Sequence, residues 1–297
     1  MTPPRKPRAA APAAALQACL AAPAPLPYFA ALVAEDDGLP LLEAAIAVAQ
    51  DEEPALDVQA VLVEIDALGR RLRARVPADA APLPRLQWLN HWFFDELGFA
   101  GNVNDFYDPR NSYLHEVLRT RRGIPITLAL LYLELGAQLG LRLAGVGFPG
   151  HFLVKLRVTR GEVVIDPVNG RSLSRDELEE RLAPYRGAGG PAGIVPLELC
   201  LQPATPRQTL ARLLRNLKEL HRSAGDRRRL LAVCERLVLL LPEAWDERRD
   251  RGLVRADLGQ VDAAAADLQA YLQHRADAAD AAELRRRLRA LGSGRVA

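Results

Sequence analysis

Apolar residues recur at helical spacing in the first third of the chain. Residues 40–50 are rich in Ala, Leu and Ile, and residues 57–76 carry an apolar stripe made of Val58, Val61, Leu62, Ile65, Leu68 and Leu72. Such spacing places the apolar side chains on one face of a helix. Asp57 precedes the second stripe and is predicted to cap it by accepting a hydrogen bond from a first-turn amide. We therefore predict a helical region over residues 37–84.

A second unit is predicted over residues 85–203. Prolines at positions 77, 82 and 84 interrupt the chain before a new apolar stripe, made of Leu86, Leu89, Phe93 and Leu97. Asn111 is predicted to cap a helix from Ser112 to about Arg119. The aromatic residues of this stretch are interpreted as core and loop packing rather than as a base-stacking platform: Phe93, Phe94, Phe99, Phe106 and Tyr107.

The longest apolar run, PITLALLYLELGAQLG, extends from Pro125 to Gly140. Pro125 suits a first helical turn, because its missing amide hydrogen would be unpaired there in any case. The run is apolar nearly all round, which is typical of a helix enclosed by other elements. We predict that this helix lies in the middle of the domain.

Two strands are predicted after that helix. HFLVKLRV alternates, so Phe152 and Val154 share one face, while His151 and Lys155 share the other, more polar face. EVVID is the return strand and ends on Asp166. An aspartate that accepts a hydrogen bond from an imidazole fixes the tautomer of the ring. The alternative is a histidine that only holds two strands together.

The register of this hairpin decides whether His151 meets Asp166. A two-residue turn at residues 160–161 would pair Asp166 with Lys155 and leave it about 13 Å from His151, at ~3.3 Å per residue. Direct pairing needs a wider loop centred on residues 158–159. We therefore predict a loop of about four residues there, and expect that the two-residue turn at residues 160–161 would exclude the dyad.

The last unit, residues 204–297, is predicted to contain only helices. A Gly- and Pro-rich linker, residues 184–193, precedes it, and Thr205 begins it with a capping box that reaches Gln208. A shift of 34 residues pairs Gly225 with Gly259, and 34 is the tetratricopeptide period. Lys218 lies where the helix crossing of such a repeat prefers a small residue. We predict two degenerate repeats and a final capping helix.

Charge and cysteine content narrow the class of partner. Lys plus Arg number 39 and Asp plus Glu 37, so the overall charge does not attract the protein to nucleic acid or to an anionic membrane. The three cysteines lie far apart and in no CxxC spacing, which indicates neither a disulfide framework nor a zinc site. His91 and His115 have no metal partner at ligand spacing and are interpreted as structural. We expect a cytoplasmic protein with no metal and no cofactor.

Residues 1–36 are expected to form a disordered leader. Basic residues before an Ala-rich run resemble an export signal, but prolines at positions 12, 23, 25 and 27 obstruct a continuous helix. No apolar stretch reaches the ~20 residues needed to span a bilayer.

The stretch LNHWFFDELGFAGNVNDFYDPRNSYLHEVL, followed by RRGIPITLALLYLELGAQLGL, GVGFPGHFLVKL and VVIDPVNG, resembles the bacterial SirB-type family. The resemblance covers residues from about 40 to 291. It implies a helix-dominated α+β fold: N-terminal helices, a papain-like or transglutaminase-like core with a small antiparallel sheet, and C-terminal tetratricopeptide-like repeats. It also implies a regulatory role, described in that family as control of the expression of a neighbouring gene.

The resemblance places a catalytic cysteine where this chain has a proline. In catalytic transglutaminase-like domains the nucleophile opens the buried helix in a G-x-C setting, and here the matching triplet is Gly123, Ile124 and Pro125. First-turn amides and a neighbouring imidazolium stabilise a thiolate, and proline offers no thiol. His151 and Asp166 match the other two members of the triad.

Three residues could substitute for the missing nucleophile, but each has a simpler interpretation. Thr127 is expected to satisfy local backbone groups, and Cys200 and Cys234 to act as small buried apolar residues. Asn111, Arg122 and Thr127 are the candidates for the wall of the cleft.

Two functions stay open on this basis. The favoured one is a non-catalytic protein-binding or regulatory protein with a protein or peptide partner, because stacked helix pairs form a concave face suited to an extended peptide. The alternative is an amide hydrolase or acyl transferase that uses His151 and Asp166 with water or with a distal cysteine. Nucleic acid and membrane are not expected as partners.

Overall fold

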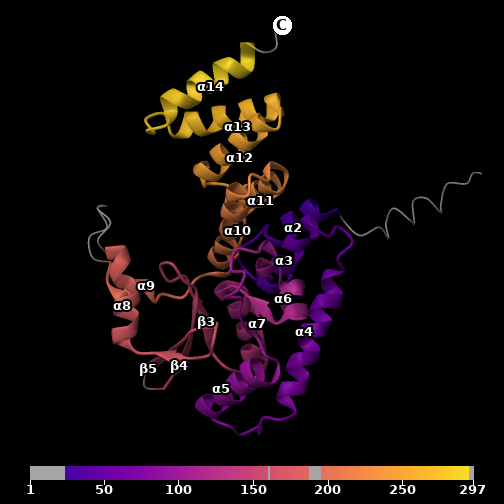
Figure 1. Cartoon of the computed structure of the whole chain (residues 1–297), viewed down its shortest axis with the longest axis vertical. Coiled ribbons are helices and arrows are strands. Elements are labelled where there is room, and N and C mark those ends of the chain that lie inside the picture. The colour runs from indigo at the N-terminus through magenta and orange to yellow at the C-terminus, as the bar shows by residue number, and fades with distance from the viewer. Residues whose placement is uncertain (1–23, 160, 187–194, 294–297) are drawn as a thin grey trace, which may run out of the picture.

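The computed structural model describes residues 24–159, 161–186 and 195–293. Figure 1 shows a lower body, in which helices enclose a small sheet, and a column of helices that rises from it to the C-terminal end. The fold is α+β and dominated by helices, as predicted. Of the expected linker, residues 187–193 lie outside the described residues, and residues 184–186 belong to a helix.

The N-terminal part contains the helices α2 (Pro25–Leu32), α3 (Leu41–Ala47) and α4 (Val58–Arg73), and a 3-10 turn at Val48–Asp51. Asp57 caps α4 as predicted, because its carboxylate accepts a hydrogen bond from the Ala60 amide. The expectation of disorder up to residue 36 is wrong for α2: Phe29 is fully buried, and the Arg236 guanidinium lies over its ring. Residues 1–23 lie outside the described residues.

Helix α7 (Pro125–Gln138) lies in the middle of the lower body, with α4 beside it (Figure 1). Two more helices pack against α7: α5 (Pro82–Asn90), which continues as a π-helical turn at His91–Glu96, and α6 (Leu114–Thr120). Pro125 opens α7, and most residues of the helix are buried, both as predicted. Asn111 is not a helix cap, since it lies in a 3-10 turn (Pro109–Ser112) and its amide is engaged elsewhere.

The main sheet is antiparallel, in the order β3 (Leu143–Val146), β4 (Leu153–Val158), β5 (Gly161–Ile165) and β6 (Ser172–Leu173). Val158 pairs with Gly161, so only two residues separate the paired ends of β4 and β5. The predicted loop of about four residues is therefore wrong, and Gly161, at φ 135°, supplies the backbone freedom that the tight turn needs. A separate parallel pair joins β1 (Ala100–Gly101) to β2 (Arg122–Gly123), directly before α7.

Both faces of the β4 strand are covered. Phe152 and Val154 belong to the main core, as the alternation predicts. The other face was expected to be polar, yet Leu153 is fully buried in a second cluster with residues of α8 (Arg175–Arg186) and α9 (Leu197–Cys200). Lys155 is also buried and donates hydrogen bonds to the Glu162 carboxylate at 3.0 Å. The sequence pattern missed this because Leu153 is the apolar residue among the polar ones of that face, and its cover comes from α8 and α9, which lie further along the chain.

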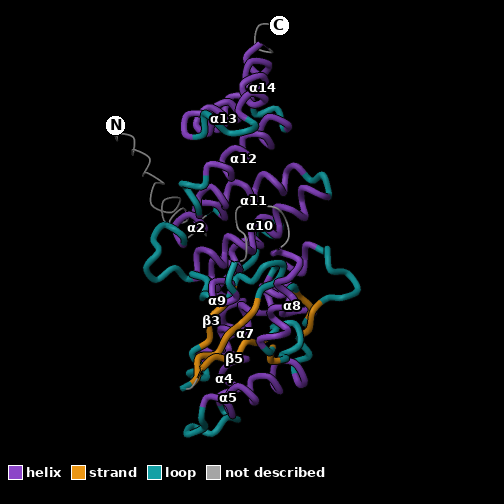
Figure 2. The backbone as a smooth tube through the Cα atoms, turned by 90° about the vertical axis from the view of Figure 1, so that its left-hand side faces the viewer, coloured by secondary structure: helices purple, strands orange, loops and turns teal. Residues whose placement is uncertain are grey.

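The C-terminal column consists of α10 (Pro206–Ser223), α11 (Arg227–Leu240), α12 (Trp245–Asp257), α13 (Val261–His274) and α14 (Ala281–Ser293). Figure 2 shows these helices stacked one on the next above the sheet. Thr205 and Gln208 form the predicted capping box. Gly225 and Gly259, paired by the 34-residue shift, both adopt positive φ in the turns of the two repeats. No helix in the described part of the chain is long and apolar enough to cross a bilayer.

The residue at the point where two helices cross differs between the two repeats. In the second repeat Gly252 provides the close approach, since a Cβ there would lie 3.0 Å from Asp267 Cβ. In the first repeat the equivalent residue is Lys218, which is buried and pairs with Glu247 and Asp250, each at 2.5 Å. A buried ammonium is tolerated here because two carboxylates replace its hydration.

Candidate functional site

His151 and Asp166 form a hydrogen-bonded pair despite the tight hairpin. His151 Nε2 lies 3.0 Å from Asp166 Oδ1. Neither residue is held by the strand register, because Asp166 follows the last residue of β5 and the chain bends at Gly150 and His151 before β4 begins. Gly150 adopts φ 67°, a conformation that favours glycine. The turn expected to exclude the dyad, at residues 160–161 with Asp166 opposite Lys155, does not occur, because Lys155 pairs with Val164 instead.

Asp166 is surrounded by hydrogen-bond donors and is only 4% exposed. Arg181 of α8 donates to Oδ2 at 2.9 Å, and the Val168 amide donates to Oδ1 at 3.2 Å. Burial raises the pKa of Asp166, but the hydrogen bonds from His151, Arg181 and Val168 outweigh it and lower the pKa to about 2. Asp166 is thus a carboxylate at neutral pH, so Nε2 of His151 carries a hydrogen and Nδ1 is left without a partner among the described residues.

Helix α8 supports the dyad from behind the sheet. Arg181 pairs with Asp166, and Tyr185, one turn later, occupies the space that a Cβ on Gly150 would need. Sequence reasoning missed both residues, because their role depends on α8 folding back over β4 and β5. Ser174 and Glu177 form a capping box at the start of α8, and such a motif indicates a helix without indicating where the helix packs.

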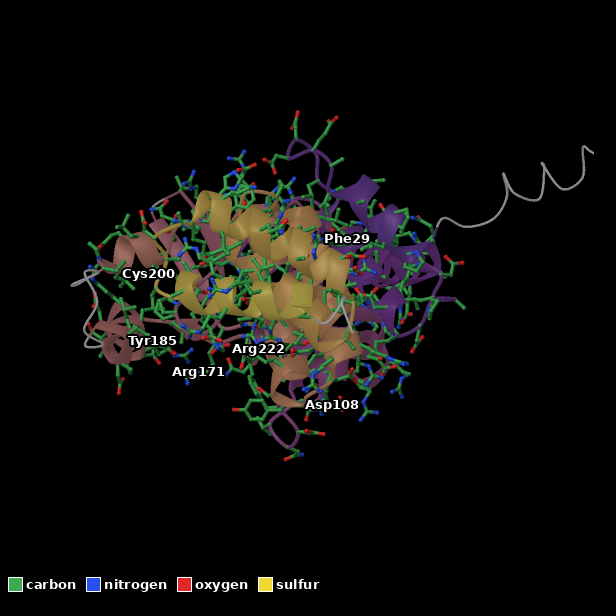
Figure 3. The ribbon with its side chains drawn as sticks, turned by 90° about the horizontal axis from the view of Figure 1, so that it is seen from above. Phe29, Asp108, Arg171, Tyr185, Cys200 and Arg222 are labelled. Carbon is green, nitrogen blue, oxygen red and sulfur yellow. The ribbon has the colours of Figure 1, made fainter. Side chains whose placement is uncertain are left out.

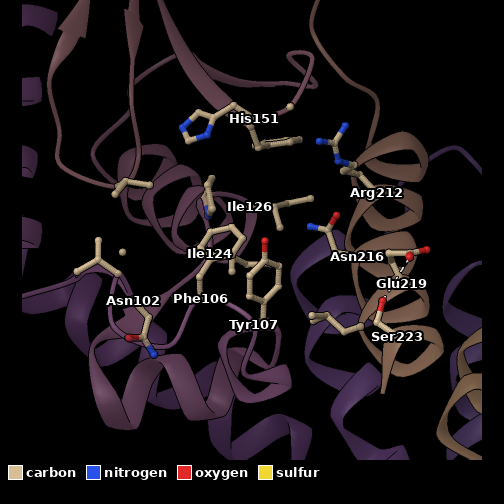
Figure 4. A pocket seen from close by; sticks show the side chains of 18 of the residues that line it. Asn102, Phe106, Tyr107, Ile124, Ile126, His151, Arg212, Asn216, Glu219 and Ser223 are labelled. Carbon is tan, nitrogen blue, oxygen red and sulfur yellow. Dashed lines mark hydrogen bonds between the residues drawn. The ribbon is translucent and has the colours of Figure 1, made fainter. Parts of the chain in front are cut away.

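A cleft of about 750 Å³ lies in front of His151. Figure 4 shows it between the core and α10. Pro125 lines this cleft, as the resemblance to a catalytic domain implies for the first residue of the buried helix. The principal lining side chains come from the rim loop of residues 102–107, the start of α7, the His151 turn, the turn after β5 and one face of α10: Val103, Phe106, Tyr107, Ile124, Ile126, Phe152, Val168, Arg212, Asn216, Glu219, Leu220 and Ser223.

Thr127 does not reach the cleft. Its side chain is fully buried, and its hydroxyl donates to the carbonyls of Asn111 and Ile124 at 2.8 and 3.0 Å. The Ile124 amide in turn donates to the same hydroxyl at 3.1 Å. Thr127 therefore fastens the start of α7 to the neighbouring turn, in agreement with its predicted role toward local backbone groups.

Asn111 and Arg122 brace the cleft without lining it. Asn111 Nδ2 donates to the Asp105 carbonyl at 2.7 Å, and its Oδ1 accepts from Asn102 Nδ2 at 3.0 Å. Arg122 donates to the Gly98 carbonyl at 2.7 Å. Both residues thus hold the rim loop and its β1–β2 anchor in place, and Asn102, which sequence reasoning missed, is the member of this network that lines the cleft.

Neither described cysteine belongs to the cleft. Cys200, at the end of α9, packs against the second hydrophobic cluster behind the sheet, and Figure 3 shows it at the edge of the molecule near Tyr185. Cys234 is fully buried in α11, and burial raises the pKa of its thiol to about 12. A thiol with so high a pKa is a poor nucleophile at neutral pH.

The face of α10 that lines the cleft was also missed from the sequence. Arg212, Asn216, Glu219 and Ser223 recur at helical spacing and form a polar stripe on an otherwise apolar-faced helix. A polar stripe is the ordinary pattern of a solvated surface. Only the packing of α10 against the core turns this stripe into one wall of a cleft.

A second polar cluster lies away from the cleft, at Glu53, His115 and Glu116. His115 Nε2 lies 3.3 Å from Glu53 Oε1, a contact between distant parts of the sequence. Glu116 is also bound by Arg119 at 2.6 Å, which lowers the pKa of the Glu116 carboxyl. These contacts fit the structural role that was predicted for His115.

Comparisons with known proteins match two successive parts of the chain, which meet within α10. A family of the transglutaminase-like superfamily matches residues 59–215 of this chain. A tetratricopeptide repeat family matches residues 217–289. A UPF0162 protein of Xylella fastidiosa is 39% identical over 240 residues, 80% of this chain and 85% of that protein. A UPF0162 protein of Pseudomonas aeruginosa is 35% identical over 216 residues, 72% of this chain and 77% of that protein. The alignment with a crystal structure of menin covers 88% of this chain and 67% of the menin chain, at 13% sequence identity and a TM-score of 0.40.

Proposed function

This chain belongs to the transglutaminase-like superfamily and to the UPF0162 proteins, and we propose that it binds a protein segment in its cleft without catalysing a reaction on it. The core supplies one wall of the binding site and the first tetratricopeptide-like helix supplies the other. The SirB-type assignment, a gene-regulatory role and a cytoplasmic location stay predictions from the sequence.

Pro125 carries this proposal. It stands at the first turn of α7 and lines the cleft together with His151, and the sequence resemblance assigns the catalytic cysteine to this position. Proline has neither a thiol nor a first-turn amide hydrogen. Among the described lining residues, Ser223 has an aliphatic hydroxyl, but Figure 4 shows it at the end of the cleft far from His151, where it donates to Glu219.

The rim of the cleft supports a binding role. Val103, Phe106 and Tyr107 are 85%, 51% and 77% exposed, although Phe106 and Tyr107 were expected to contribute to packing. Asn102 and Asn111 hold the loop that presents them, so their exposure is built into the fold. Clustered apolar side chains at a cleft entrance are typical of an interaction site.

Turnover is the first test. Full-length protein would be incubated with a casein digest and a primary amine, and mass spectrometry would follow hydrolysis, deamidation and amine incorporation. We expect no product above that of the His151→Ala variant. Product that requires His151 in a well-folded protein would contradict the non-catalytic proposal.

Occupation of the cleft is the second test. Ala224 lines the cleft and is exposed, so Ala224→Trp should fill the entrance and abolish binding of peptides selected from a random library on the wild-type protein. Ala266 of α13 is exposed outside the cleft, and Ala266→Trp is the matched control. Equal binding by both variants would place the peptide elsewhere.

One observation favours the enzymatic alternative. An ionised Asp166 at 3.0 Å orients His151 as it would in a hydrolase, and a positioned imidazole can activate water. The amides of the first turn of α7 would provide part of an oxyanion hole. The same casein assay decides between the two functions, because an enzyme of this kind loses its product signal in His151→Ala while a binding protein has none to lose.

A further inference from the structure

We propose that the bound segment is an extended peptide that places a carboxylate against Arg212, with an apolar side chain next to it. This inference rests on the proposed function and specifies the chemistry of the partner. It arises from the polar groups of the cleft that the fold itself leaves without partners.

Arg212 differs from the other arginines of α10. Arg207 pairs with Asp36, Arg215 with Glu247 and Arg222 with Asp250. Arg212, which is half-buried and lines the cleft, makes no hydrogen bond or ion pair with any residue that the structure describes. Figure 4 shows its guanidinium on the α10 side of the cleft, at the same end as His151. A guanidinium in a partly dehydrated cleft gains most from a carboxylate, which it binds through two parallel hydrogen bonds.

Glu219 does not neutralise Arg212. It is the carboxylate residue among those that line the cleft, but it pairs with Arg222 at 3.1 Å and accepts a hydrogen bond from Ser223. It lies seven positions after Arg212, about 10 Å along a helix. The His151 end of the cleft therefore carries an uncompensated positive charge, which is complementary to an anionic group of a partner.

The groups around Arg212 suit a peptide rather than a bare anion. Asn216, one helical turn from Arg212, has no hydrogen-bond partner among the described residues, and a side-chain amide can donate to and accept from a peptide backbone. Ile126 and Phe152 line the same cleft and provide apolar contact for a neighbouring side chain. An apolar cleft with a few convergent polar groups is the usual form of a specific binding site.

The carboxylate has two possible sources, an Asp or Glu side chain and the C-terminus of a chain. Two random 12-residue libraries would separate them, one displayed internally with both ends fused and one displayed with a free C-terminus. We expect full-length protein to select an acidic residue beside an apolar one from the first library, or an apolar C-terminal residue from the second.

Variants then test Arg212 itself on the selected peptides. Arg212→Gln should weaken binding at least about tenfold, the effect of losing one charge-assisted contact of about 1.4 kcal/mol. Arg228→Gln, an equal change of charge at an exposed position of α11, should leave affinity unchanged. Arg212→Glu should restore binding when the acidic residue of the peptide is replaced by lysine.

The outcomes separate this inference from the proposed function. Selected peptides without an acidic group, or acidic peptides that bind Arg212→Gln as well as wild type, would overturn the carboxylate assignment while keeping the binding function. An equal loss in Arg228→Gln would also overturn it, because a general charge effect would then explain the binding. Failure of both libraries to give any cleft-dependent peptide would overturn both proposals.

Discussion

His151 on one wall of the cleft and Arg212 on the other differ in whether the described part of the fold provides them with a partner. On the core wall, the Asp166 carboxylate accepts hydrogen bonds from His151 and Arg181, and Tyr185 packs against the Gly150 turn that carries His151. On the α10 wall, Arg212 and Asn216 have no partner within the described part of the molecule. Partnered groups contribute to the stability of the fold, whereas unpartnered groups at a cleft are available to a ligand. Substitutions on the two walls should therefore differ in kind.

Removal of Asp166 should have the largest effect on stability. Asp166→Ala leaves Arg181 and His151 without their acceptor, so the free energy of unfolding should fall by about 2–4 kcal/mol. Urea denaturation of the full-length protein measures this. His91 and Asp95 form an exposed pair at 2.9 Å, and Asp95→Ala, the control, should cost no more than about 0.5 kcal/mol. Equal effects of the two substitutions would mean that the core wall is no more tightly held than the surface.

The pH dependence of the free energy of unfolding should report the same interaction of Asp166. Because the pKa of Asp166 is lowered from its ordinary 3.8 to about 2, the folded state binds fewer protons than the unfolded state between these values. The contribution of Asp166, about 2 kcal/mol, should be complete above pH ~4 and lost as the pH falls toward ~2. Unfolding of wild type and Asp166→Asn should therefore differ near neutral pH and converge in acid. A difference that is constant with pH would contradict this assignment.

The turn that places His151 should be sensitive to a single methyl group. Gly150→Ala forces a left-handed backbone on alanine and places its Cβ on the Tyr185 hydroxyl, at a cost of about 1–2 kcal/mol. Gly147→Ala is the matched control, because a Cβ there meets no atom within 4 Å. Thermal unfolding compares the two. A neutral Gly150→Ala would show that the turn adapts more easily than its geometry indicates.

The α10 wall should show the smallest effect on stability. Arg212→Gln removes no contact with the described residues, so the free energy of unfolding should change by less than about 0.5 kcal/mol. Denaturation in urea checks this directly. A loss comparable with that of Asp166→Ala would show that Arg212 supports the fold, and the contrast between the walls would disappear.

Most of the fold followed from local patterns. The buried helix α7, the cap at Asp57 and the repeat turns at Gly225 and Gly259 depend on residues close together in the chain, and all are as predicted. The predictions that were wrong concern contacts between elements that lie far apart in the sequence. Helix α2 forms because Phe29 packs beneath Arg236, and the polar-looking face of β4 is buried because α8 and α9 cover it.

The sequence by itself determined the helix-dominated order of elements, the 34-residue repeat and the proline at the start of α7. These features depend only on the spacing and the types of residues along the chain. It also pointed to His151 and Asp166, but with the wrong hairpin. Only the tertiary structure decided that they meet at 3.0 Å, that Arg181 also pairs with Asp166, and that Arg212 lines the cleft. Burial and distance depend on how α8 and α10 pack against the core, and no local spacing encodes that packing.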